Sequence, residues 1–250
     1  MKGNIAIIAA VSGELAPLVK HRTARSWNRV SSISGVEMWE YLHADGCWLA
    51  VCAGMGGRRA TVALAEAEKR KNIAAICSVG WAGALKSVFE AEKIYTPSLI
   101  VDTATGEQFR PAKLSVDWPI LVSTSSVADA DEKQKLATMY GAGLVDMEAA
   151  TLAKIALSKA IPFYCMKAIS DEANAELPNI NPFINDSGQL KMLPFLLNLS
   201  TRPSSWAPLA KLGKHSAAAA KNLAESLYDW LDERTYIRQE LGDYSKFESK

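Results

Sequence analysis

Continuous apolar runs alternate along the chain with segments in which apolar residues recur at helical spacing. The apolar runs are typical of buried strands, and they lie at residues 4–11, 73–79, 94–102, 119–123 and 162–169. Two further runs, 36–41 and 47–52, flank an Asp45-Gly46 turn and predict a β-hairpin. Helical spacing occupies 58–71, a segment ending near Tyr140, and 149–157. This alternation predicts a three-layer α/β/α fold with a mostly parallel, mixed central sheet.

The stretch from Gly143 to Ala156 holds two acids, Asp146 and Glu148, where an apolar run changes to helical spacing. An acid at such a junction either caps the helix or faces a pocket, because burial without a partner is costly. Asp146 is the better cap candidate. Glu148 is the better pocket candidate, because a helix rarely needs a second capping acid. Two capping acids without any chemistry remain the alternative for this stretch alone.

Two more acids follow apolar runs. Glu14 comes after the first run, within Ser12-Gly13-Glu14-Leu15, and Asp171 comes after the run 162–169. Each has a structural alternative, a first-turn helix residue for Glu14 and a helix cap for Asp171. In open α/β sheets, however, ligands bind at the carboxyl ends of the strands. Three acids brought to that edge suit acid–base chemistry on a bound small molecule.

Glycine-rich segments follow two of the predicted strands, at residues 53–57 and 80–84. Backbone amides at a helix start bind anions, and glycine also allows close approach of the backbone to a ligand. The dinucleotide-binding fingerprint is incomplete, because Arg59 stands at the position of its third glycine. Close approach to a ligand, or tight packing, is the preferred interpretation.

Composition narrows the class of protein. The 250 residues are 49% hydrophobic and 22% charged with a net charge of +1, which gives no electrostatic case for nucleic acid as a partner. The four cysteines lie in apolar runs and predict buried free thiols, and the three scattered histidines form no metal motif. The amino-terminal apolar run is too short for a signal peptide. We therefore expect a cytoplasmic protein without a metal or cofactor.

Five segments in order, IAIIAAVSGEL, CAGMGG, SVGWAGAL, VDMEAATLA and KAISDEAN, resemble the motifs of the nucleoside phosphorylase superfamily over roughly residues 4–175. The most similar branch is that of the methylthioadenosine/S-adenosylhomocysteine nucleosidases. The run 186–231 resembles the hopanoid-associated branch, whose members are linked to removal of adenine from adenosylhopane. The resemblance implies a nucleoside phosphorylase-like catalytic domain at 1–182, a helical extension at 183–250 packed on it, and a homo-oligomer.

The resemblance also implies that the chain cleaves the N-glycosidic bond of an adenine nucleoside. Glu14 would position and activate the attacking water, and Asp171 would protonate purine N7, with Ser170 as its hydrogen-bond partner. Met147 and Glu148 would pack under the ribose and bind its hydroxyls. Further substrate contacts would come from the segments that flank the base and the glycine-rich turn, namely Val127, Ala128, Gly80, Trp81 and Ala82.

Two chemical requirements follow. Asp171 would need a raised pKa to hold a proton near neutral pH, which burial or a nearby like charge provides. Residues 11–18 contain no Lys or Arg, and Glu14 would repel phosphate, so hydrolysis is favoured over phosphorolysis. Arg58 and Arg59 keep a phosphorylase as the alternative.

Trp81 stands where the nucleosidases usually have a small residue. Its ring would narrow the pocket, stack on the substrate or block it, and the alternative is that it faces a subunit interface. A hydrophobic 5′-substituent is therefore plausible, and so is an inactive nucleoside-binding relative. The apolar faces of 183–234 predict packing on the core or on a partner subunit, or else a peripheral surface for a lipid-like substrate.

Overall fold

The computed structural model describes residues 3–20, 26–43, 46–112, 119–175, 179, 181–185, 188, 191, 194–195 and 206–247, with side chains to residue 231. The strands are β1 (Asn4–Ala9), β2 (Asn28–Val30), β3 (Glu37–His43), β4 (Gly46–Cys52), β5 (Ile73–Ala84), β6 (Ile94–Tyr95), β7 (Leu99–Asp102), β8 (Gln108–Phe109), β9 (Ile120–Ser123), β10 (Leu144–Asp146) and β11 (Phe163–Asp171). The helices are α1 (Ser12–Lys20), α2 (Gly57–Arg70), α3 (Ala130–Tyr140), α4 (Ala149–Ser158) and α6 (Trp206–Phe247), with a 3-10 turn at Asn181–Phe183.

The strands form one mixed sheet in the order β2-β3-β4-β1-β5-β10-β9-β7-β8, with β11 paired to β5 and β6 paired to β11. The long central pairings of β1 with β4 and of β5 with β1 and β11 are parallel, whereas β10 runs antiparallel to β5. Near the end of β5, Gly83 pairs with Val145 of β10 on one side and with Asp171 of β11 on the other. Three strands therefore converge at this point of the sheet.

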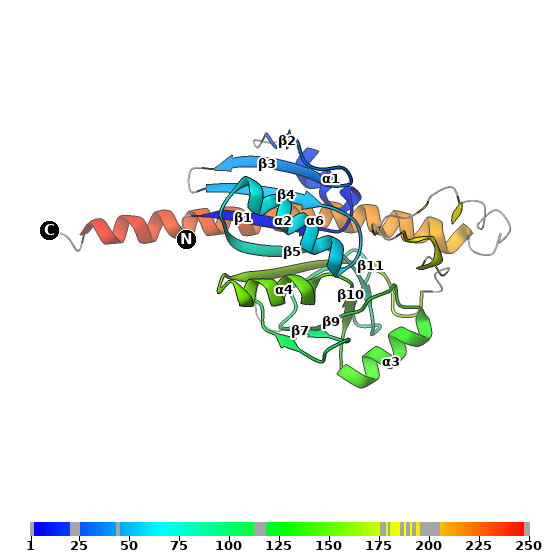
Figure 1. Cartoon of the computed structure of the whole chain (residues 1–250). Helices are drawn as coiled ribbons and strands as arrows, with labels where there is room; N and C mark the ends of the chain where they lie inside the picture. The colour runs from blue at the N-terminus through cyan, green and yellow to red at the C-terminus, as the bar shows by residue number, and fades with distance from the viewer. Residues whose placement is uncertain are drawn as a thin grey trace.

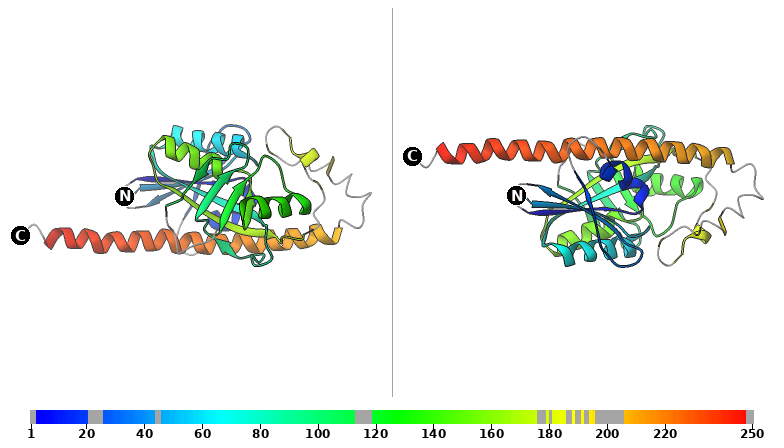
Figure 2. Two further views of the ribbon diagram at one scale, coloured as in Figure 1. Left: turned by 90° about the horizontal axis from the view of Figure 1, so that it is seen from below. Right: turned by 90° about the horizontal axis from the view of Figure 1, so that it is seen from above.

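Helices cover both faces of the sheet (Figures 1 and 2). On the face of α2 and α4 the core includes Leu64, Ile76 and Leu152, and on the face of α1 and α6 it includes Ile7 and Leu223. Burial of these side chains stabilises the fold by roughly 25 cal/mol per Å² of apolar surface removed from water. The predicted three-layer α/β/α fold with a mixed central sheet is confirmed.

Most predicted elements match the observed ones. The helices α2, α3 and α4 lie where helical spacing placed them, and the β3–β4 hairpin is antiparallel with its turn residues 44 and 45 outside the described part. All four cysteines are free and buried, as predicted.

Two expectations are wrong. The run 94–102 forms two strands with different neighbours, since Pro97 between them lacks an N–H to donate.

The second correction concerns the glycine-rich segment 80–84, which was expected to be a loop after the strand. Strand β5 continues through it to Ala84, because its backbone keeps pairing with β11 as far as Gly83 and pairs with β10 at Gly83 and Ala84. Gly80 adopts a φ of 128°, a conformation that glycine tolerates and other residues rarely adopt. The glycines therefore shape a strand that lines the site, and they do not form a loop beside it.

Helix α6 has 42 residues, lies across the face of the sheet that α1 also covers, and extends past the rest of the molecule at its carboxyl end (Figure 2). Leu223, Leu227 and Leu231 are buried in the core on that face. This half of the tail therefore packs on the core. Most of the other apolar segment, 192–199, lies outside the described residues.

Candidate active site

A cavity of about 360 Å³ lies where β5, β10 and β11 converge. This volume falls within the range of small-molecule sites. Its walls come from α1, the end of β5, the segment after β9, α3, the junction of β10 with α4, the end of β11, and α6. The lining residues include all three acids singled out in the sequence, Glu14, Glu148 and Asp171.

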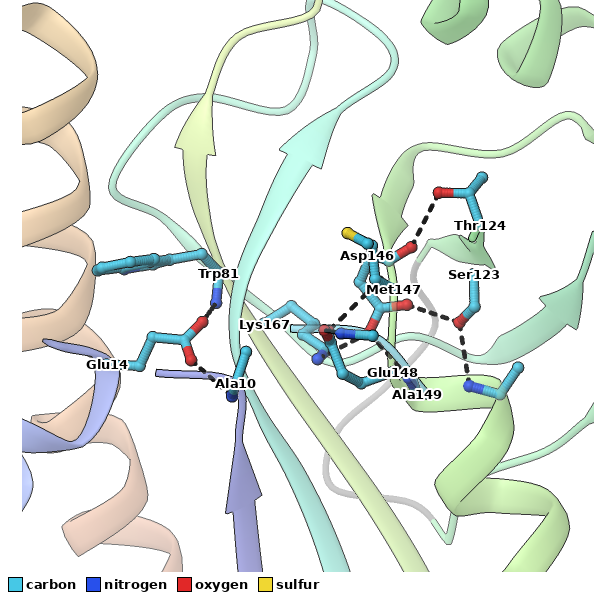
Figure 3. A network of polar contacts seen from close by, with 12 residues as sticks. Ala10, Glu14, Trp81, Ser123, Thr124, Asp146, Met147, Glu148, Ala149 and Lys167 are labelled. Carbon is cyan, nitrogen blue, oxygen red and sulfur yellow. Dashed lines mark hydrogen bonds and ion pairs between the residues drawn. The ribbon is translucent and has the colours of Figure 1, made fainter. Parts of the chain in front are cut away.

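Glu14 is 4% exposed, and backbone amides hold its carboxylate in place (Figure 3). Oε2 accepts hydrogen bonds from the amides of Ala10 (2.8 Å) and Val11 (2.9 Å), and Oε1 accepts one from the amide of Trp81 (2.6 Å). Gly80 makes this approach possible, since a Cβ there would lie well under 3.0 Å from Oε1. Burial raises the pKa of Glu14, while the amide donors act in the opposite direction.

Asp146 fixes the junction between β10 and α4. Its Oδ2 accepts a hydrogen bond from the amide of Ala149 (3.0 Å), so it caps the helix as predicted, and its Oδ1 accepts one from the hydroxyl of Ser123 (2.6 Å). Oδ2 also pairs with Nζ of Lys167 at 2.8 Å, and this lysine is 1% exposed. Burial acts to lower the pKa of Lys167, but the nearby Asp146 carboxylate raises it above the ordinary value. The network ties the carboxyl end of β10 to Ser123, to the start of α4 and to Lys167 of β11 (Figure 3).

Glu148, 9% exposed, lines the cavity, as predicted for the second acid of the stretch. Its Oε1 accepts a hydrogen bond from the amide of Gly56 at 2.6 Å, just before α2 begins. The glycine-rich turn at 53–57 therefore binds a carboxylate of the chain itself at a helix start. Burial, followed by repulsion from Asp146, raises the pKa of Glu148 to about 7. This group can exchange a proton near neutral pH.

Asp171 ends β11 with both carboxylate oxygens occupied. The hydroxyl of Ser170 donates to Oδ1 at 2.6 Å, and the ammonium of Lys133 pairs with Oδ2 and donates to the carbonyl of Glu172 at 2.8 Å. We expected burial or a second negative charge beside Asp171. The structure instead places the positive charge of Lys133 there. The reason is that Lys133 lies on the inner face of α3, one turn before the buried Leu136.

Trp81 closes the cavity on the side of α6. Its indole N–H donates to the carbonyl of Ser216 at 3.0 Å, and its ring lies against Gly13, where a Cβ would approach to 3.2 Å. Leu212 and Ser216 of the same helix complete the wall. The indole therefore meets a helix of its own chain, where a subunit interface was the alternative expectation.

The structure brings most of the predicted residues to the cavity. Besides the three acids, the lining contains Met147, Ser170, Trp81, Ala82, Val127 and Ala128, whereas Gly80 lies behind Glu14 and outside the lining. Sequence reasoning missed several further lining residues, namely Met55, Thr124, Lys133, Leu212 and Ser216. A signal existed for Lys133, a cation on the apolar side of an amphipathic helix. The contribution of α6 had no such signal, because it depends on long-range packing.

Positive charge in the cavity is limited. Among the described lining residues Lys133 is the single cation, and it is paired with Asp171. Arg58 is exposed, and Arg59 donates to the carbonyls of Ala53 (2.7 Å) and Gly35 (3.2 Å). The described residues include no cluster of metal-binding side chains. No helix in the described part is long and apolar enough to cross a membrane.

Known proteins share this fold. The family model of the Phosphorylase superfamily matches residues 103–189. MTAN of Helicobacter pylori, solved with 5′-methylthioadenosine in its active site, is 13% identical with a TM-score of 0.70, covering 93% of this chain and 100% of its own. The 5′-methylthioadenosine nucleosidase of Arabidopsis thaliana is 15% identical with a TM-score of 0.70, covering 92% and 95%. Futalosine hydrolase of Helicobacter pylori is 14% identical with a TM-score of 0.68, covering 93% and 99%. No curated protein matches the chain in sequence.

Proposed function

We propose that this chain hydrolyses the N-glycosidic bond of a purine nucleoside that carries adenine and an apolar 5′-substituent. The observation that carries the proposal is the convergence of Glu14, Glu148 and Asp171, from three separate segments, on one cavity of about 360 Å³. The superfamily match at 103–189 and the fold shared with nucleosidases support it.

Each acid has a role that fits its surroundings. Cleavage of an N-glycosidic bond develops positive charge on the ribose, as in glycoside hydrolysis. Glu148, beside Met147 in the cavity wall, would bind the ribose hydroxyls and stabilise that charge. Glu14 would hold the attacking water through Oε1, which accepts one amide hydrogen bond and keeps a second lone pair, whereas Oε2 already accepts two. The Asp171 end of the cavity would receive the base.

Water is favoured over phosphate as the nucleophile for an electrostatic reason. A phosphate would need an unpaired cation, and the one lysine of the described lining is already paired with Asp171. The carboxylate of Glu14 stands close to where phosphate would bind, and it would repel the anion.

An apolar 5′-substituent fits the side of the cavity that α6 closes. Trp81, Leu212 and Val11 contribute apolar surface to the lining. Such a wall suits an alkyl or lipid-like group, as in adenosylhopane, better than a charged one, because Leu212 and Ser216 of α6 carry no charge to pair with a desolvated one.

The test is adenine release from methylthioadenosine, S-adenosylhomocysteine and a 5′-alkyl adenosine, each with and without phosphate. We expect release without phosphate, highest for the alkyl substrate, and lost in Asp171→Asn. The matched control is Asp131→Asn, an exposed acid on α3, which should keep full activity. Release that requires phosphate would overturn the hydrolytic mechanism. No release from any of the three would reject the proposed function.

A further inference from the structure

Lys133 is a buried cation for which the proposed function has no role. Its side chain is 3% exposed and that of its partner Asp171 is 11% exposed. Burial of a lysine carries a large desolvation penalty, which only a well-placed partner offsets. The lysine reaches the cavity from α3, and its ammonium contacts the carboxylate of Asp171 and the carbonyl of Glu172. It therefore lies at the end of the cavity proposed for the base.

The hydrogen bonds of Asp171 are those of a carboxylate. Its Oδ2 faces an ammonium, which can only donate hydrogen bonds. Its Oδ1 accepts one from the hydroxyl of Ser170 at 2.6 Å. A proton on Oδ2 would point at the protons of the ammonium. The contacts are therefore those of an ion pair between a carboxylate on Asp171 and an ammonium on Lys133.

Gly83 creates the space for this arrangement. A Cβ at that position would lie 3.1 Å from Oδ2 of Asp171 and 3.2 Å from Cε of Lys133. The glycine thus lets the pair lie against β5 at the point where β10 and β11 also meet it. An ammonium has three N–H groups, and the contacts with Asp171 and Glu172 use two of them. The hydrogen bonds among the described residues leave the third for a ligand in the cavity that Lys133 lines.

We propose that Lys133 donates the proton to the leaving base and that Asp171 orients it as a carboxylate, an inference that rests on the proposed hydrolysis. As the C1′–N9 bond breaks, its electron pair moves into the purine ring, and N7 takes a proton from Nζ. Water adds its oxygen to C1′ and gives one proton to Glu14. The neutral amine of Lys133 regains a proton from solvent, and Glu14 releases its proton there, so that atoms and charges balance.

The experiment compares two leaving groups in the full-length chain. One substrate is the purine nucleoside that the unmodified chain cleaves, and the other is a 4-nitrophenyl riboside with the same 5′-substituent. Nitrophenolate is a stable anion and departs without a proton. The variants are Lys133→Met, Lys133→Arg and, as a matched control, Lys135→Met, which replaces an exposed lysine on the same helix.

We expect both Lys133 variants to lose about 10²-fold or more in kcat/KM for the purine nucleoside, the typical size of a proton-transfer contribution. Cleavage of the nitrophenyl riboside should stay within a few-fold, which also shows that the variant site is folded. Arginine keeps the positive charge beside Asp171 but does not give up a proton. Lys135→Met should match the unmodified chain on both substrates.

Three results would overturn the inference. Full purine cleavage by Lys133→Arg would mean that the charge alone matters. Equal losses on both substrates in Lys133→Met and Lys133→Arg would mean that the lysine only maintains the site. Full purine cleavage by Lys133→Met would remove the lysine from the reaction while leaving the proposed function intact. By contrast, an unmodified chain that cleaves no purine nucleoside would reject the proposed function itself.

Discussion

Replacing Glu148 with glutamine should stabilise the protein at alkaline pH while removing its activity. Burial raises the pKa of Glu148 from an ordinary value of 4.5 to about 7 in the folded state. The folded chain therefore holds the proton more tightly than the unfolded chain does. The stability that this proton contributes is fully present below pH 4.5 and is lost as the pH rises through about 7. Glutamine does not ionise, so the variant avoids this loss.

The expected size of the effect follows from that rise in pKa. A rise from 4.5 to about 7, at about 1.36 kcal/mol per pH unit, gives about 3 kcal/mol in the free energy of unfolding. The glutamine carbonyl can still accept the 2.6 Å hydrogen bond from the amide of Gly56. The longer contact from the amide of Met147, at 3.3 Å, is lost at small cost. The variant should therefore gain most of the 3 kcal/mol above pH 8.

Urea unfolding at pH 5 and pH 8.5 measures this difference directly. The gap in unfolding free energy between Glu148→Gln and the unmodified chain should widen by about 3 kcal/mol between the two pH values. Glu90→Gln changes an exposed acid and should show no such widening. Base release should fall sharply in Glu148→Gln alone. If all three proteins show the same pH dependence of stability, the argument that the buried Glu148 carboxylate destabilises the folded protein at high pH is refuted.

Three further substitutions, one of them with a matched control, test other parts of the site. Asp146→Ala removes the ion-pair partner of Lys167 and leaves its buried ammonium on β11 unpaired. We expect urea unfolding to show a loss of about 3–5 kcal/mol in the free energy of unfolding. Gly80→Ala combines a φ of 128° with a clash against the carboxylate of Glu14. We expect it to lose base release and about 1–3 kcal/mol in the free energy of unfolding. Gly106→Ala is the control for Gly80→Ala, because Gly106 also has a positive φ (75°) but has open space where a Cβ would lie. It measures the effect of backbone strain alone, and its base release should be unchanged. Trp81→Phe leaves the carbonyl of Ser216 without its 3.0 Å hydrogen bond, and thermal unfolding should show a loss of about 1 kcal/mol.

The acids of the site could be predicted from sequence because each one follows a run of apolar residues. Such runs are short-range patterns, and they place Glu14, Glu148 and Asp171 near the ends of buried strands before any packing is known. The same reasoning separated Asp146, which caps α4, from Glu148, which lines the cavity. The three-layer fold followed from the alternation of strands and helices. These features depend on neighbours in sequence, and they are the ones that were predicted correctly.

The charge around those acids depends on neighbours in space, and the sequence did not predict it. Asp171 and Lys133 are 38 residues apart, and their contact requires α3 to lie with its inner face toward the end of β11. Helix α6 reaches Trp81 across 135 residues. Each contact matters for the proposed mechanism, because the first places a cation beside Asp171 and the second places α6 in the wall of the cavity. The acids can therefore be read from sequence patterns, while the charge beside them depends on residues outside those patterns, which is why Lys133 is the residue on which the proposed mechanism should be tested.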